Sequence, residues 1–79
     1  MRVVLVEDDA KIRRFLQKGL VEAGYAVETA SDAASGRHLA LGGAADAVIL
    51  DLGLPDADGL EVVKAMRAAA LVTPVLVLT

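Results

Sequence analysis

The chain has 79 residues, enough for one small domain, and 56% of them are hydrophobic while only 3% are aromatic. Its net charge of −3 and the lack of any basic run argue against a nucleic-acid-binding surface within this segment. It contains no cysteine, which excludes disulfide frameworks and thiolate metal sites. The N-terminus resembles neither a signal peptide nor a membrane span, so we expect a cytoplasmic protein without membrane contact.

The first two elements are predicted to be a buried strand and a helix. The strand covers Arg2–Val6, an apolar run that is closed by Glu7, Asp8 and Asp9. Asp9 is interpreted as the N-cap of the helix rather than as a ligand, and Gly24 is expected to end that helix. The predicted inward face of the helix, at helical spacing, comprises Ile12, Phe15, Leu16, Leu20 and Ala23.

A second, shorter strand is predicted over Tyr25–Ala30. Its apolar and polar residues alternate, which is typical of an edge strand. Ser31-Asp32 then opens a second helix over Ala33–Leu41, and Gly42-Gly43 ends it.

The third strand is the most distinctive stretch of the chain. Val48-Ile49-Leu50 runs directly into Asp51, and the turn-compatible residues Gly53 and Pro55 follow at once. In open parallel α/β sheets the ligand crevice lies at the carboxyl ends of the strands. Asp51 is therefore expected at a position where a carboxylate is both accessible and fixed.

A loop and a third helix complete the pattern before the last strand. The loop, Asp56-Ala57-Asp58-Gly59, offers two aspartates as N-caps. The apolar face of the helix is predicted to comprise Leu60, Val63, Met66 and Ala70. Thr73-Pro74 breaks the helix, and a fourth strand over Val75–Leu78 precedes Thr79.

Strands and helices thus alternate, and this order predicts parallel strands joined by helical crossovers. Such a topology places Glu7, Asp8 and Asp51 side by side at strand ends. Gathered carboxylates raise one another's pKa unless a cation neutralises them. Their hard oxygen atoms suit Mg²⁺, which also assists attack on a phosphoryl group.

Together these motifs closely resemble the receiver domain of two-component response regulators. The residues that carry the resemblance span the whole chain: Val3 to Asp9, Asp51 to Pro55, Asp58-Gly59 and the strand that ends at Thr79. The register is most similar to that of transcriptional regulators with a winged-helix DNA-binding domain after the receiver. The resemblance implies a flavodoxin-like α/β fold, a parallel sheet in the order 2-1-3-4, and a signalling role rather than that of an enzyme.

The resemblance also implies a role for each residue of the acidic cluster. Asp51 would accept a phosphoryl group from a sensor histidine kinase, and Asp8, Asp51 and the backbone carbonyl of Gly53 would bind Mg²⁺. Glu7 would act on the metal ion through a water molecule or by contacting the residues that bind the ion. The Thr79 hydroxyl would hydrogen-bond the phosphoryl oxygen and report phosphorylation to the neighbouring surface.

The chain departs from the family pattern in one respect. Receivers continue through a fourth helix, a fifth strand that ends in a phosphoryl-pairing lysine, and a fifth helix. Residues 1–79 are therefore expected to form a single incomplete receiver domain, truncated before those elements, with slowed or lost phosphoryl transfer. DNA would be contacted only by an output domain outside this chain, and the exposed fourth-strand edge would allow self-association.

Two alternative functions stay open at this point. The chain could serve as a structural or self-associating module without phosphotransfer. It could also be a phosphatase or a flavin-binding protein of similar topology. Against a phosphatase, the nucleophile of aspartate phosphatases usually follows the first strand, whereas the better-flanked aspartate here, Asp51, follows the third.

Overall fold

The computed structural model describes residues 1–78, in which four strands alternate with three helices. In chain order these elements are β1 (Arg2–Val6), α1 (Ala10–Glu22), β2 (Ala26–Ala30), α2 (Ala33–Leu41), β3 (Ala47–Asp51), α3 (Leu60–Ala68) and β4 (Val75–Leu78). The predicted alternation is confirmed, and the predicted bounds of β1 and α2 agree with the observed ones. One strand boundary differs, because β2 begins at Ala26 and not at Tyr25.

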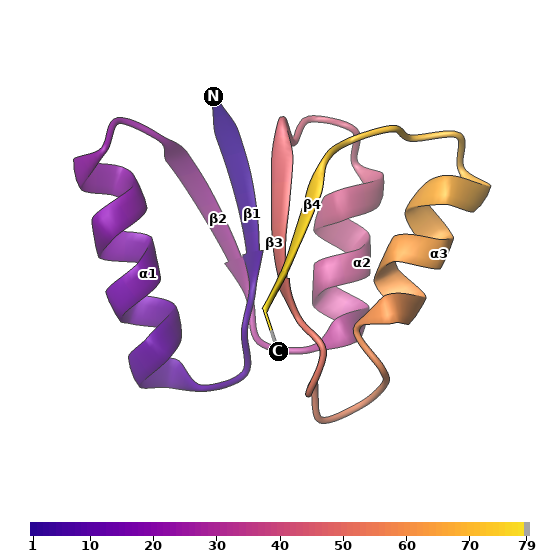
Figure 1. The fold of residues 1–79 in the computed structure, drawn as a ribbon, viewed down its shortest axis with the longest axis horizontal. Helices are drawn as coiled ribbons and strands as arrows, with labels where there is room; N and C mark the ends of the chain where they lie inside the picture. The colour runs from indigo at the N-terminus through magenta and orange to yellow at the C-terminus, as the bar shows by residue number, and fades with distance from the viewer. Residues whose placement is uncertain (79) are drawn as a thin grey trace.

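The four strands form one parallel sheet in the order β2-β1-β3-β4, as the resemblance implied. Val6 at the end of β1 pairs with Leu50 of β3, so the two central strands end at nearly the same level. Figure 1 shows the carboxyl ends of the strands together at the lower edge of the sheet. Whatever follows β1 and β3 in the sequence therefore meets at this edge.

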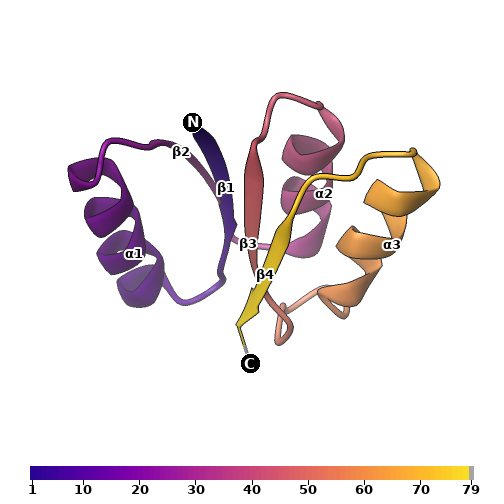
Figure 2. The ribbon, with the colours of Figure 1, turned by 45° about the horizontal axis from the view of Figure 1, so that its top comes forward.

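The helices cover the two faces of the sheet unequally. α2 and α3 lie together on one face and α1 lies alone on the other (Figures 1 and 2). The main core lies between the sheet and the α2–α3 layer, and its buried residues are Val4, Val6, Ala30, Ala33, Ala40, Val48, Leu50, Leu54, Val62 and Met66. The aliphatic core expected from the composition is therefore present.

The α1 side is the more open one. No residue of α1 is buried. Leu16 and Leu20 are half-buried as expected for an inward face, but Phe15 is 77% exposed and Ile12 is also exposed. The prediction that Ile12 and Phe15 belong to the inward face of this helix was thus wrong, because helical spacing identifies an apolar stripe but not which of its residues the sheet covers.

The prediction for α3 was also wrong in part. Leu60 is 44% exposed, whereas Val62 and Met66 are buried, so the inward stripe is rotated relative to the predicted one. The helix ends at Ala68, and Ala70 lies beyond it with a φ of 61°. Within residues 1–78, no helix combines the length and the apolar character needed to cross a membrane.

Candidate functional site

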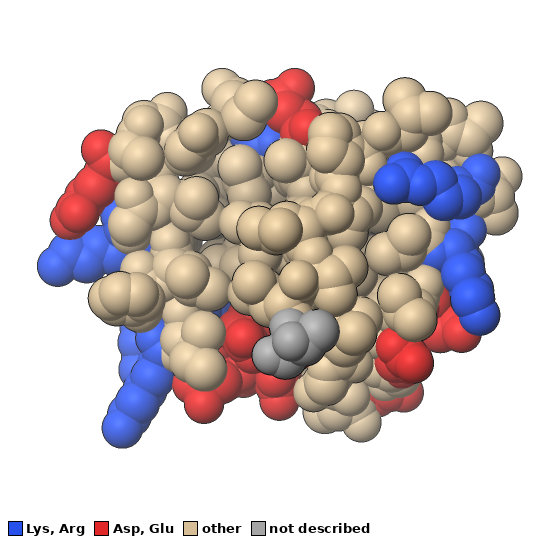
Figure 3. Space-filling view, viewed as in Figure 1, with Lys and Arg blue, Asp and Glu red and all other residues tan. Residues whose placement is uncertain are grey.

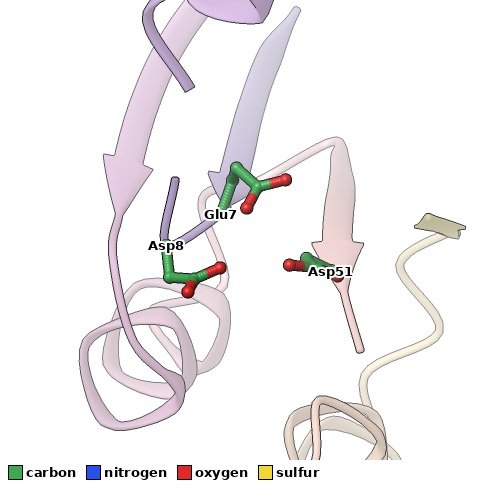
Figure 4. Close-up of side chains that lie close together, drawn as sticks. All are labelled: Glu7, Asp8 and Asp51. Carbon is green, nitrogen blue, oxygen red and sulfur yellow. The ribbon is translucent and has the colours of Figure 1, made fainter. Parts of the chain in front are cut away.

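Three carboxylates converge at the lower edge of the sheet. One oxygen from each of Glu7, Asp8 and Asp51 lies within 4.8 Å of the other two. Figure 4 shows the three side chains directed into the space between the end of β1 and the end of β3. The strand pairing explains this arrangement, since Glu7 follows the last residue of β1 directly and Asp51 is the last residue of β3. The predicted cluster is therefore formed.

Glu7 is the buried member of the cluster, with 5% of its surface exposed. Burial raises the pKa of the Glu7 carboxyl, and the nearby negative charge of Asp51 raises it further, while the backbone N–H of Asp9 opposes the change. That N–H donates to Oε2 of Glu7 over 3.1 Å. A carboxylate buried among other carboxylates is a group that a bound cation would stabilise.

The backbone that carries Glu7 and Asp8 is held from α1. Nη1 of Arg13 donates to the carbonyl oxygen of Glu7 over 2.9 Å and to that of Asp8 over 3.3 Å. Asp9 caps the helix as predicted, with Oδ1 accepting from the N–H groups of Lys11 and Ile12. Sequence analysis missed this role of Arg13, although its position one turn after the cap places it near the loop.

Asp51 is half-buried, and its carboxylate is held by Gly53, whose carbonyl was expected to share a metal ion with it. Its Oδ1 accepts a hydrogen bond from the Gly53 N–H over 3.1 Å. Its Oδ2 accepts no hydrogen bond from the described residues. A Cβ atom added to Gly53 would lie 3.8 Å from Oδ1, so a side chain at Gly53 would stand directly beside the carboxylate. Asp51 thus has one oxygen that is oriented and one that is available.

The loop from β3 to α3 closes on itself at Gly59. The Gly59 N–H donates to the carbonyl oxygen of Leu52 over 3.2 Å. Gly59 is buried, and a Cβ atom there would collide with the carbonyl oxygen of Asp51 and lie 3.0 Å from Cα of Leu52. The loop after β3 can therefore close this tightly only because residue 59 has no side chain.

The two loop aspartates have different roles. Asp58 precedes the N-cap of α3, which is Gly59 and not either predicted aspartate, and its Oδ1 accepts from the Leu60 N–H over 2.9 Å. Asp56 instead reaches α2, where its Oδ1 accepts from the Ala33 N–H over 2.7 Å and its Oδ2 from the Ala34 N–H over 3.1 Å. The Ala33 N–H is the main cause that lowers the pKa of Asp56. Sequence analysis missed this contact because it joins residues far apart in the chain.

The structure thus brings together Glu7, Asp8, Asp51 and Gly53, the candidate site residues within the described part of the chain. Thr79, the fifth candidate, lies outside the described residues.

The comparison with protein families agrees with this geometry. Residues 3–79 match the family described as the response regulator receiver domain. The chain belongs to this family. The receiver domain predicted from the acidic motifs is therefore confirmed, and its matched relatives are named as regulatory proteins.

This receiver domain is 44% identical over 79 residues to the probable transcriptional regulatory protein SilR of Salmonella typhimurium. It is 43% identical over the same length to the transcriptional regulatory protein CusR of Escherichia coli strain K12. Each alignment covers 100% of this chain and 35% of the relative, so the chain spans about a third of the length of the curated relatives it matches.

Solved structures show the same fold. The solved structure of the non-phosphorylated HemR receiver domain from Leptospira biflexa superposes on this chain with a TM-score of 0.90 at 33% sequence identity. The superposition covers 96% of this chain and 61% of the HemR chain. The fold of this receiver domain, with its sheet order 2-1-3-4, is therefore the fold of solved receivers.

Proposed function

We propose that Asp51 accepts a phosphoryl group from a sensor histidine kinase, in a site that holds Mg²⁺. The observation that carries the proposal is the convergence of Glu7, Asp8 and Asp51 within 4.8 Å at the carboxyl ends of two adjacent parallel strands. Membership of the receiver family supports it, because receiver domains work with histidine kinases.

The donor set fits Mg²⁺. It consists of hard oxygen atoms, which this ion prefers, and they lie at the end of β3 and in the segment directly after β1. In the proposed site Asp8 and Asp51 bind the ion with the backbone carbonyl of Gly53, and Glu7 acts through a water molecule. When bound, the ion would offset the repulsion between the carboxylates and the incoming phosphoryl oxygens.

The residues of the chain prepare Asp51 for attack in two ways. The Gly53 N–H holds Oδ1, which orients the carboxylate and leaves Oδ2 available as the nucleophile. An oxygen–phosphorus bond forms, and the bond between phosphorus and the imidazole nitrogen of the phosphohistidine breaks. The nitrogen keeps the electron pair. With acetyl phosphate as the donor, acetate leaves in the same way.

Mass spectrometry tests this function. The chain is incubated with acetyl phosphate and Mg²⁺, and its intact mass is measured. We expect the slow addition of one phosphoryl group, in keeping with the slowed transfer expected from the sequence, and we expect this addition to disappear in Asp51→Asn and when Mg²⁺ is removed by a chelator. Asp46→Asn is the matched control, since Asp46 precedes β3 at the opposite end of the strand and accepts from the Arg2 N–H. A wild-type chain that gains no mass would refute the proposal.

In the whole protein, we propose that this receiver controls a DNA-binding output domain in the cytoplasm. The support is that matched relatives are named as transcriptional regulatory proteins.

A second candidate function is self-association without phosphotransfer. β4 is at the edge of the sheet, and Leu76 and Val77 are 60% and 37% exposed. Figure 3, which has the view of Figure 1, shows an uncharged surface in the middle of the visible face, with charged side chains at its margins. An uncovered apolar edge strand is a template for pairing with another chain.

Light scattering after size-exclusion chromatography tests this candidate. We expect concentration-dependent dimers that Leu76→Lys disrupts. Val72→Lys is the control, because Val72 is 88% exposed and lies outside β4. A wild-type chain that stays monomeric at high concentration would exclude self-association.

A further inference from the structure

The loop that carries Gly53 is anchored at several points between β3 and α3. Its base is closed by the hydrogen bond from the Gly59 N–H to the Leu52 carbonyl oxygen. Leu54, 8% exposed, is inserted into the main core. These two anchors fix where the loop begins, ends and enters the core, but a loop held at such points can still rotate about them.

Asp56 supplies the anchor that resists this rotation. Both of its carboxylate oxygens accept backbone N–H groups, those of Ala33 and Ala34 at the start of α2. Two hydrogen bonds to adjacent N–H groups define an orientation as well as a distance. The negative charge also lies at the positive end of a nine-residue helix, where it is stabilised.

α2 does not need Asp56 for its own nearest cap. Asp32 fills that position, with its Oδ1 accepting from the Ser35 N–H over 2.7 Å. Asp56 therefore adds a connection between two elements rather than replacing a missing cap. Only two residues separate Asp56 from Gly53, and one of them is Pro55, whose ring fixes φ. A change in the orientation of Asp56 is thus passed along a short, stiff segment.

We propose that Asp56 is a positioning residue for the acidic cluster of Glu7, Asp8 and Asp51: by tying the β3–α3 loop to the first turn of α2, it sets the orientation of the peptide units at Gly53 and so the affinity of the cluster for a divalent cation. The part of this inference that concerns the cation rests on the proposed function. The part that concerns the Gly53 peptide does not, because it applies equally to the metal-free protein.

The test compares Asp56→Ala with Asp32→Ala. Each variant removes a carboxylate from the start of α2, but only the first removes a contact with the loop. Backbone amide NMR of the metal-free proteins reports the two peptide units that flank Gly53 through the amide signals of Gly53 and Leu54, the latter belonging to the unit that contains the Gly53 carbonyl. We expect the Gly53 amide signal to move in Asp56→Ala and to keep its position in Asp32→Ala.

Titration with Mg²⁺, followed through the same amide signals, then measures affinity. We expect Asp56→Ala to bind Mg²⁺ about 10-fold more weakly, as is typical when a group that supports metal ligands is removed. Asp32→Ala should bind with the wild-type affinity. Asp56→Asn keeps one oxygen acceptor, so its loss should be smaller, and this variant decides the question if Asp56→Ala does not fold.

Two outcomes would overturn the inference. If Asp56 and Asp32 variants weaken Mg²⁺ binding equally, Asp56 is only a helix cap. If the Gly53 signal does not respond to substitution of Asp56, the loop is positioned by its other anchors. A wild-type chain without a saturable Mg²⁺ response would instead refute the proposed metal site, and the Gly53 signal in the metal-free variants would still decide the role of Asp56.

Discussion

Gly59→Ala separates the effect of a close backbone contact from that of helix propensity. Gly59 has φ −55° and ψ −27°, a conformation that alanine adopts without strain. Considered alone, the backbone therefore predicts stabilisation by about 0.4–1 kcal/mol. The added Cβ would however meet the Asp51 carbonyl oxygen and Cα of Leu52, and neither backbone atom can rotate away. Overpacking of this kind costs about 1–3 kcal/mol.

We expect the collision to dominate, so that Gly59→Ala is less stable than the wild type. In a domain of this size each kcal/mol lowers Tm by roughly 4–8 °C. Gly19→Ala is the matched control, because Gly19 lies inside α1 and a Cβ there would have no neighbour within 4 Å. That variant should gain about 1 kcal/mol.

Urea and thermal unfolding, followed by circular dichroism, measure both variants. The Mg²⁺ titration should show weaker binding in Gly59→Ala alone, since the displaced atoms belong to the strand end that carries Asp51. If Gly59→Ala is as stable as the wild type or more stable, the close approach described for this loop is incorrect.

Three other variants test the electrostatics and backbone of the domain. The pKa of Glu7 lies above its ordinary 4.5, so ionised Glu7 destabilises the metal-free fold and Glu7→Gln should raise Tm at neutral pH. This gain in Tm should vanish below pH 4.5, and a lower Tm of the variant at neutral pH would contradict the reasoning. The pKa of Asp56 lies below its ordinary 3.8, so ionised Asp56 stabilises the fold above pH 3.8, and this stabilisation is lost as the pH falls through the pKa of the folded state. Asp56→Asn should therefore reduce the fall in Tm at acid pH, and an unchanged fall would argue against the contact with α2. Ala70→Gly should add roughly 0.5–1 kcal/mol in urea unfolding because it relieves a φ of 61°, and no gain would show that Ala70 is unstrained.

The acidic site could be predicted from the sequence because its determinants are local. Glu7 directly follows β1 and Asp51 ends β3, both short apolar strands, and alternation of strands with helices makes those strands parallel. The carboxyl ends of adjacent parallel strands must then meet. The caps Asp9 and Asp32 were predictable for the same reason, since each acts within three residues of its own position.

The features that could not be predicted depend on contacts between residues far apart in the chain or on which face of a helix points inward. Asp56 accepts a hydrogen bond from Ala33 of α2, which lies 23 residues earlier in the chain, and no pattern within the loop indicates that partner. In α3 the adjacent apolar residues Val62 and Val63 allow two inward stripes, and only the packing shows that Val62 is fully buried while Val63 is partly buried against the core. The position of Ala70 beyond the helix end is equally invisible, because alanine favours helix continuation.

The uneven covering of the sheet has a consequence for how the pocket is held together. α1 contributes no buried residue, whereas α2 and α3 both do, so α1 can detach by local unfolding at a lower free energy than the rest of the domain. Arg13, which holds the backbone carbonyls of Glu7 and Asp8, belongs to that helix, and Asp9, whose N–H donates to Oε2 of Glu7, is its N-cap. The segment of Glu7 and Asp8, which follows β1, is thus held in part by the least stable layer, whereas Asp51 ends β3 in the sheet itself. A ligand that binds Glu7 and Asp8 more tightly while Arg13 holds their backbone therefore stabilises the docked position of α1 by mass action.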